Sequence, residues 1–274
     1  MSTLEAIVLG IVQGLTEFLP ISSTGHLRIV PAFLGWHDPG AEFTAVTQLG
    51  TMAAVLLYFR EDLLRIGRAW VRSLRDASVR STLDARLGWY IVLGTIPIGI
   101  FGLAFKDQIE NGARDLYLIA TALIVLGLLL LVAERTATHD RPLERITSRD
   151  GAVIGLAQAL ALVPGVSRSG ATLTAGLFLG LDRPSAARFS FLLSVPAVVL
   201  SGLLEFGSIL DGTDDERAGL GALAVATLLA FVVGYASIAL LLRFLASHST
   251  VAFVVYRVAL GALVLTLLGT GVIG

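Results

Sequence analysis

The sequence predicts an all-α integral membrane protein, and three observations lead to that prediction. Of the 274 residues, 55% are hydrophobic and only 15% are charged, whereas an average soluble domain has about 25% charged residues. Several apolar stretches are long enough to cross a bilayer as a helix, among them 116–133, 220–242 and 251–273. Two more apolar stretches are each interrupted by a polar cluster containing glycine and proline. Because a backbone in lipid must satisfy its own hydrogen bonds, each spanning stretch must be helical.

The composition also excludes several classes of function. The net charge is −1 at pH 7, so the charge balance gives no indication of nucleic-acid binding. The chain contains no cysteine, which excludes disulfides, thiolate metal sites and a cysteine nucleophile. The first ten residues, MSTLEAIVLG, have neither a basic region nor a cleavage site. We therefore expect the N-terminal segment to belong to the membrane domain.

The distribution of arginines predicts how the chain is oriented. Seven arginines lie between residues 60 and 86, and four more lie between 134 and 150. By the positive-inside rule, both loops face the cytoplasm. The segments 35–42 and 205–217 contain few basic residues and are expected outside. We interpret the arginines of 60–86 as a solvated cytoplasmic extension that fixes this orientation.

Six membrane crossings connect these loops. The predicted crossings are 43–59, 87–105, 116–133, 186–206, 218–242 and 250–273. For every loop to lie on its predicted side of the membrane, the interrupted segments 1–35 and 149–181 must each enter and leave the membrane on the same side. We interpret both as re-entrant helical hairpins, the first from outside and the second from the cytoplasm, which places both chain termini outside.

An internal repeat supports the two hairpins. When the chain is shifted by 145 positions, residues 5–41 match residues 150–186 at eleven identical positions. The identical pairs include Gln13 and Gln158, Ser22 and Ser167, and Gly25 and Gly170. Residues 1–145 and 146–274 then form two repeats, each with one hairpin and three crossings. Because three is odd, the second repeat is inverted, and the hairpin tips can meet near the bilayer midplane.

The first interrupted segment carries the polar residues of a candidate anion site. Gln13 and Glu17 are four residues apart and therefore lie on one helical face. Pro20 then interrupts the helix, and hydroxyl residues occupy the start of the next one. These residues are Ser22, Ser23 and Thr24, and His26 follows them. Hydroxyls and free N–H groups at a helix start favour anion binding.

The second interrupted segment repeats this pattern and adds an arginine. Its candidate anion-binding residues are Gly165, Ser167, Arg168, Ser169, Gly170 and Thr172. The planar guanidinium of an arginine binds phosphate oxygens in pairs, so two converging tips predict a phosphate site. Burying an ionisable residue at the centre of a membrane helix costs about 2.5–3.5 kcal/mol, which favours a functional role for Glu17 and Arg168. For Arg257, in the last apolar stretch, a structural role and a place lining the cavity are equally good interpretations.

Glu17 and His26 make this anion site a candidate reaction site. Glu17 is a candidate base or a candidate ligand for a divalent cation. An oxygen-rich site of this kind suits Mg²⁺ or Ca²⁺ better than zinc. His26, which has an ordinary pKa near neutrality, is a candidate nucleophile or general acid.

The two segments QGLTEFLPISSTGHL (13–27) and PGVSRSGATL (164–173) resemble the paired motifs of the undecaprenyl-diphosphate phosphatases, also called bacitracin-resistance proteins. The resemblance in length and hydropathy extends over the whole chain. It implies a multi-pass enzyme of the bacterial plasma membrane that uses a divalent cation, Mg²⁺ or Ca²⁺. The implied reaction converts the C55 isoprenoid diphosphate to the monophosphate, which recycles the lipid carrier for cell-wall synthesis.

The resemblance also implies roles for individual residues. The family's first motif falls on Gln13 and Glu17, which would hold the cation. Its serine and histidine fall on Ser23 and His26, either of which is a candidate nucleophile, and the spacing does not decide between them. Its arginine signature falls on Ser167, Arg168, Ser169 and Thr172. Gln13 represents the amide variant of the first motif and supplies a neutral oxygen, so a metal would be held less tightly. Thr44 stands where many relatives have an acidic residue. Any role of that carboxylate in the family therefore has no corresponding carboxylate at this position of the sequence.

A carrier of the same lipid is the alternative from another functional class. Inverted repeats with sites between broken helices are typical of transporters, and a prenyl-phosphate flippase needs the same phosphate site. Glu17 and His26 beside the hydroxyls favour hydrolysis, because carriage needs no nucleophile. A non-catalytic assembly factor would leave the cost of the buried polar groups unexplained. The expected partners are a prenyl diphosphate and membrane lipid, with no nucleic acid, and a homodimer is left open.

Overall fold

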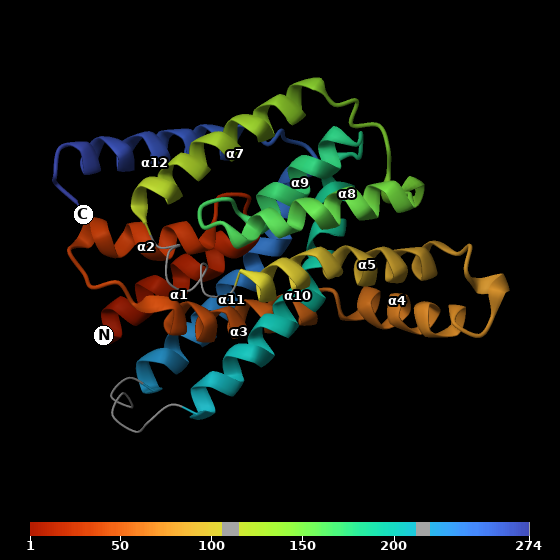
Figure 1. Ribbon diagram of the computed structural model, residues 1–274, viewed down its shortest axis with the longest axis horizontal. Helices are drawn as coiled ribbons and strands as arrows, with labels where there is room; N and C mark the ends of the chain where they lie inside the picture. Colours follow the sequence, from red (N-terminus) through yellow and green to blue (C-terminus); the bar gives the residue numbers. More distant parts are fainter. Residues whose placement is uncertain (106–114, 212–219, 274) are drawn as a thin grey trace.

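The computed structural model describes residues 1–105, 115–211 and 220–273, and these ranges form a bundle of helices (Figure 1). The helices are α1 (Thr3–Phe18), α2 (Ser23–Leu34), α3 (Gly40–Tyr58), α4 (Arg60–Ser73), α5 (Leu83–Ala104), α7 (Leu116–Thr136), α8 (Ser148–Ala159), α9 (Arg168–Phe178), α10 (Arg183–Asp211), α11 (Leu220–Leu245) and α12 (Val251–Gly269). Short 3₁₀ turns are η1 (Ala77–Val79), η2 (Leu143–Arg145) and η3 (Leu160–Leu162). Within these ranges the only β pairing is an isolated bridge between Arg141 and Leu181.

Four of the described helices are long and apolar enough to cross a membrane: α5, α7, α11 and α12. They correspond to four of the predicted crossings, 87–105, 116–133, 218–242 and 250–273. The predicted crossing 43–59 corresponds to α3, whose apolar part is Phe43–Tyr58, and 186–206 lies within α10. Residues 212–217 of the predicted outer loop, and 218 and 219 of the fifth crossing, lie outside the described residues. The chain is a multi-pass helical membrane protein.

Each interrupted segment forms two helices joined by a sharp break. In the first segment α1 is followed by α2, and in the second α8 and η3 are followed by α9. Ser22 and Ser167 precede α2 and α9 with φ angles of 74° and 71°, which is an uncommon conformation for residues other than glycine. Each serine hydroxyl accepts a hydrogen bond from the backbone N–H three residues later. The donor to Ser22 is Gly25 at 3.3 Å, and the donor to Ser167 is Gly170 at 3.1 Å. Two segments 145 residues apart therefore begin their second helix in the same way.

The first helix of each broken segment packs on a helix from the other half of the chain. Helix α1 packs mainly against α11, and α8 packs mainly against α5. Glycines permit the close approach: a Cβ on Gly10 would lie 2.5 Å from the carbonyl oxygen of Ala226, and one on Gly155 would lie 2.4 Å from the Cα of Gly94. Small residues of this kind let membrane helices pack backbone to backbone. The two halves of the chain therefore support each other's breaks.

The arginine-rich segment 60–86 is mainly helical, and most of its arginines are exposed, as expected of a solvated extension. Helix α4 lies along α5, and both project from the bundle at the end opposite the chain termini (Figure 1). The Trp70 side chain packs on Gly88, where an added Cβ would lie 2.6 Å from the Trp70 Cβ. The apolar residues Leu63, Ile66 and Trp70 follow a helical period of three and four residues, so α4 has one face that packs and one that carries arginines. This amphipathic pattern was not predicted from the sequence, because only the arginines of the segment were considered.

Candidate active site

The two helix breaks bring Glu17 and Arg168 into contact. The Arg168 Nη2 lies 2.5 Å from the Glu17 Oε1, although the residues are 151 positions apart in the chain. The exposed fractions of the two side chains are 16% for Arg168 and 7% for Glu17. The ion pair is therefore largely shielded, and in such surroundings opposite charges interact more strongly than at a surface in water.

The second oxygen of Glu17 receives two more hydrogen bonds. The Ser23 hydroxyl donates to the Glu17 Oε2 at 2.6 Å, and the Gln13 Nε2 donates to the same oxygen at 3.3 Å. The Gln13 Oε1 is buried and has no hydrogen-bond partner among the described residues. One carboxylate thus joins a hydroxyl, an amide and a guanidinium, and an unpaired amide oxygen lies beside it.

Arg168 retains hydrogen-bonding capacity. Its contact with Glu17 uses Nη2, and within ranges 1–105, 115–211 and 220–273 no partner is recorded for Nε or Nη1. Neither of these two nitrogens is fully buried. A guanidinium has five N–H donors in one plane, so Arg168 can bind an anion while it faces Glu17.

His26 lies next to this group but makes its contacts elsewhere. Its Nδ1 donates to the Ser22 carbonyl at 2.6 Å, and its Nε2 lies 2.6 Å from the Tyr256 hydroxyl. The rings of His26 and Tyr256 are nearly parallel, with an interplanar angle of 7° and centroids 5.6 Å apart. His26 is buried. No hydrogen bond joins His26 to Glu17, Ser23 or Arg168 within the part of the chain that the structure describes.

Several of the predicted anion-binding hydroxyls bond to other protein groups. The Ser169 hydroxyl donates to the Leu19 carbonyl at 3.0 Å and lies 3.1 Å from the Ser167 hydroxyl. The fully buried Thr172 hydroxyl donates to the Arg168 carbonyl at 2.8 Å and contacts Ser190. Thr24 is exposed beside Ser22, with their hydroxyls 3.3 Å apart. Ser22 and Ser167 cap helices, as described above. Among the serines whose side chains the structure describes, Ser23 is the one whose hydroxyl contacts Glu17.

Arg257 is fully buried and joins both breaks through backbone carbonyls. Its guanidinium donates to the carbonyls of Pro20 at 3.0 Å, Gly165 at 3.1 Å, Val166 at 3.0 Å, Leu123 at 3.1 Å and Ala122 at 3.4 Å. No ion pair of Arg257 occurs among the described residues. Of the two interpretations that the sequence leaves open, these contacts support the structural one.

Two of the predicted glycines are required by close packing at these breaks. Gly165 has a φ of 87°, and a Cβ there would lie 2.5 Å from the Ile119 carbonyl oxygen. A Cβ on Gly170 would lie 2.7 Å from the Nη1 of Arg257. Thr44 donates its hydroxyl to the Gly40 carbonyl at 3.0 Å.

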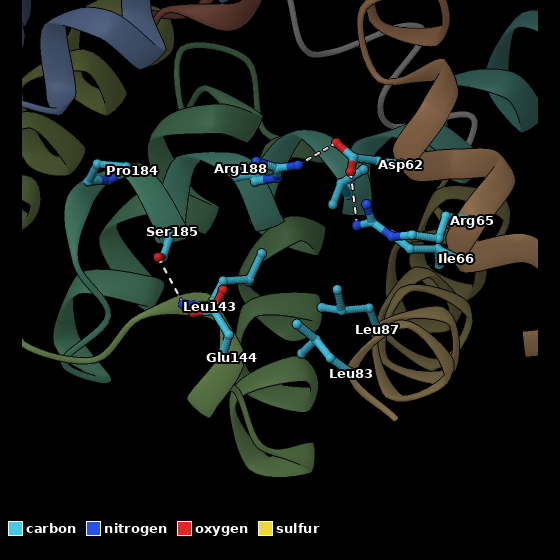
Figure 2. Close-up of a pocket in the computed structure, with 11 residues that line it drawn as sticks. Asp62, Arg65, Ile66, Leu83, Leu87, Leu143, Glu144, Pro184, Ser185 and Arg188 are labelled. Carbon is cyan, nitrogen blue, oxygen red and sulfur yellow. Dashed lines mark hydrogen bonds and ion pairs between the residues drawn. The ribbon is translucent and has the colours of Figure 1, made fainter. Parts of the chain in front are cut away.

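A separate cavity of about 260 Å³ lies between α4, α5 and α10 and contains none of the predicted site residues (Figure 2). Asp62 lies between the two guanidinium groups that line it, at 3.0 Å from Arg65 and 2.6 Å from Arg188. The Ser185 hydroxyl accepts from the Leu143 N–H at 2.9 Å. Because Asp62 already pairs with both arginines, the cavity offers a phosphate much less positive charge than its lining suggests.

Sequence reasoning missed one residue that contacts the site, Tyr256. A tyrosine in an apolar helix carries no signal of its own. Its proximity to His26 depends on how α12 packs against the rest of the bundle, which the order of residues does not reveal. Its neighbour Arg257, a charge in the same apolar stretch, was the only indication that this part of α12 faces polar groups.

Comparisons with known proteins show which family this chain is similar to. The family model described as "Bacitracin resistance protein BacA" matches residues 6–263. A Nocardioides protein named undecaprenyl-diphosphatase is 56% identical over 270 residues, covering 98% of each chain. The undecaprenyl-diphosphatase of Myxococcus xanthus is 57% identical over 271 residues, covering 99% of this chain and 91% of that protein. The one from Mycolicibacterium smegmatis is 56% identical over 274 residues, covering 100% and 99%.

Proposed function

The chain belongs to the bacitracin resistance protein BacA family, and from this premise we propose that the Glu17–Arg168 site is where it hydrolyses undecaprenyl diphosphate. The products are undecaprenyl phosphate and inorganic phosphate, so the reaction recycles the lipid carrier for cell-wall synthesis and gives bacitracin resistance. One observation supports the location more than any other. A shielded carboxylate lies within hydrogen-bond distance of both a guanidinium at 2.5 Å and a serine hydroxyl at 2.6 Å.

Arg168 binds the diphosphate in this proposal. Its remaining N–H donors are suited to two phosphate oxygens at once. The amide N–H groups at the starts of α2 and α9 add partial positive charge, and Thr24 and Ser169 lie at these starts. The prenyl chain stays in lipid between apolar helices, where it needs no polar partner.

Ser23 is the proposed nucleophile, because its hydroxyl is already hydrogen-bonded to a carboxylate. When the diphosphate binds to Arg168, the guanidinium has a second anion, and Glu17 is free to accept a proton. The Ser23 oxygen then attacks the terminal phosphorus, its proton passes to Glu17, and the bond to the bridging oxygen breaks. Glu17 passes this proton to the bridging oxygen, and undecaprenyl phosphate leaves. Water next cleaves the bond between Ser23 and phosphorus with Glu17 as the base, Ser23 regains a proton, and inorganic phosphate leaves.

The residues present fit a divalent cation bound together with the substrate. Among the described residues no three carboxylate or histidine side chains gather into a metal site. However, Mg²⁺ is often held by one or two carboxylates with substrate phosphates completing its ligands. Glu17 and the unpaired Oε1 of Gln13 are the side-chain oxygens that would hold it. When bound, Mg²⁺ or Ca²⁺ supplies positive charge at the phosphate oxygens.

The proposed topology has six crossings and two re-entrant hairpins, with residues 1–145 and 146–274 as inverted repeats of one membrane domain. The matching geometry of Ser22 and Ser167 supports the repeat. The position of the arginine-rich segments at the end of the molecule opposite both termini supports an orientation with both termini outside (Figure 1). In this topology the two tips approach the bilayer midplane from opposite faces.

Phosphate release from a short prenyl diphosphate in detergent tests the proposed function. We expect turnover by the wild type and a loss of about 10²–10⁴-fold in Glu17→Ala and Ser23→Ala, with Arg168→Ala and His26→Ala also impaired. Brief incubation with substrate carrying a labelled terminal phosphate should label wild-type protein but not Ser23→Ala. Turnover by Ser23→Ala at the wild-type rate would contradict the proposed nucleophile. A folded protein that moves the lipid across liposomes without releasing phosphate would be a carrier.

Gln13→Glu should make the protein bind the cation more tightly. A second carboxylate adds ligand charge, so the Mg²⁺ concentration for half-maximal activity is expected to fall by about tenfold. Without metal the two carboxylates of Gln13→Glu repel each other one helical turn apart, so Tm should fall below that of the wild type and rise when Mg²⁺ is added. Gln13→Ala, which removes the amide oxygen, is the matched control and should raise the required concentration. If neither variant changes the Mg²⁺ dependence of activity or of Tm, Gln13 is not a ligand.

A further inference from the structure

The imidazole of His26 is held at both nitrogens by groups that do not react. A carbonyl can only accept, so the contact of 2.6 Å with the Ser22 oxygen places a proton on Nδ1. In the neutral ring Nε2 then carries the lone pair, and the Tyr256 hydroxyl donates to it at 2.6 Å. Neither nitrogen faces Ser23 or Glu17 in a hydrogen bond within the described part of the chain. This geometry gives His26 no direct path to the reacting atoms.

The Ser22 carbonyl belongs to the peptide that leads directly into Ser23. Ser22 has a φ of 74°, a conformation that a serine adopts at a cost and that surrounding contacts must hold in place. The same carbonyl accepts from the His26 backbone N–H at 3.2 Å and from the His26 ring. The ring therefore fixes the peptide plane from which the Ser23 side chain projects.

Tyr256 ties this peptide to a helix from the far end of the chain. Its hydroxyl reaches His26 across 230 positions of sequence. The next residue, Arg257, binds the carbonyl of Pro20 on one break and those of Gly165 and Val166 on the other. One turn of α12 therefore contacts both helix breaks. Contacts from this turn can fix how the residues of the two breaks are aligned with each other.

We propose that Tyr256 and His26 form a positioning chain that aligns Ser23 with Glu17, and that His26 takes no part in bond making. The chain runs from the Tyr256 hydroxyl through the His26 ring to the Ser22 carbonyl. The inference rests on the proposed function in one respect, since Ser23 is the group being aligned. It predicts that a side chain without acid, base or nucleophilic capacity can replace the imidazole if it reproduces the Nδ1 donor.

His26→Asn tests this directly, because the asparagine amide nitrogen stands close to the place of Nδ1 but can neither titrate nor attack phosphorus. We expect kcat for His26→Asn to fall about three- to tenfold, the effect of losing one neutral hydrogen bond. His26→Ala, which loses both contacts, should fall about 100-fold. KM should change little in either variant, since neither side chain binds the diphosphate. If His26→Asn is as inactive as His26→Ala while its Tm matches the wild type, the imidazole acts chemically and the proposal is wrong.

Tyr256→Phe tests the other end and keeps the ring that packs in α12. It should lower kcat about three- to tenfold, and it should cause no further loss in a His26→Asn background, because asparagine does not extend to the Tyr256 hydroxyl. Tyr117→Phe, at another exposed tyrosine in an apolar helix, is the matched control and should leave kcat unchanged. Losses that multiply in the double variant, or an unchanged kcat in Tyr256→Phe, would overturn the coupling.

A spectroscopic measurement separates this inference from the nucleophile assignment. In protein with ¹⁵N-labelled histidine, the His26 signals should correspond to the Nδ1–H tautomer, and Tyr256→Phe should shift the Nε2 signal. This result does not depend on activity, so it holds even if Ser23→Ala remains active and the proposed nucleophile fails. An Nε2–H tautomer would overturn the positioning chain whatever Ser23 does.

Discussion

Arg168→Lys is expected to lower kcat/KM for prenyl diphosphate hydrolysis by about 10²–10³-fold, even though it keeps the positive charge. The guanidinium can contact Glu17 through Nη2, 2.5 Å away, and still offer a second edge to the phosphates. An ammonium is a point charge with no such edge, so it can satisfy the carboxylate or the phosphate oxygens but not both in this geometry. The loss should appear in both KM and kcat, because the same group binds the diphosphate and stabilises the charge that develops on it.

Steady-state phosphate release on purified variants measures this effect, with Tm as the check on folding. Arg188→Lys is the matched control, because Arg188 pairs with Asp62 at the separate cavity and contacts none of the site residues. Glu17→Gln combined with Arg168→Lys should lose much less than the product of the two single losses, since the residues act as one unit. A wild-type kcat/KM in Arg168→Lys would show that the planar set of N–H donors of the guanidinium is not needed.

Arg257→Met should be the most destabilising single change in the bundle that leaves the Glu17–Arg168 contact residues intact. Methionine fills much of the volume but removes the donor to five carbonyl oxygens, of which those of Pro20, Gly165 and Val166 lie outside helices. The cost should be on the order of 3–5 kcal/mol, because a buried polar group without a partner keeps its full desolvation penalty. The two breaks would then lose their shared anchor, and activity should fall with stability.

Thermal unfolding in detergent checks this, with an expected fall in Tm of about 5–15 °C. Arg243→Met is the matched control, since Arg243 is exposed near the end of α11 and its replacement should shift Tm by little. Gly170→Ala approaches the same anchor from the other side, because its Cβ would lie 2.7 Å from the Arg257 Nη1. It should reproduce part of the loss. An unchanged Tm in Arg257→Met would mean that the carbonyls find other partners, and the anchor would have no energetic weight.

The chemistry-bearing residues were the most predictable part of the site. Glu17 and Arg168 stand out because an ionisable residue inside an apolar segment has a cost that only a partner or a function offsets. The prediction that Ser22 and Ser167 begin the second helices follows from the 145-residue match and from the capping preference of serine. The separate cavity shows the limit of such reasoning, because the sequence gives no sign that Asp62 pairs with Arg188 from another helix as well as with Arg65.

By itself, the sequence determined that this chain is a helical membrane protein with two interrupted segments and a carboxylate and a guanidinium that need each other. These features follow from composition and local spacing, because apolar length, helix period and capping act over only a few residues. Only the tertiary structure decided that Ser23 rather than His26 meets Glu17, that Arg257 joins the two breaks through carbonyls, and that Tyr256 holds His26. Each of these contacts joins groups more than five positions apart in sequence, and most join different helices. Their distances are therefore set by how α1, α2, α9 and α12 pack, and local patterns carry no information about that packing.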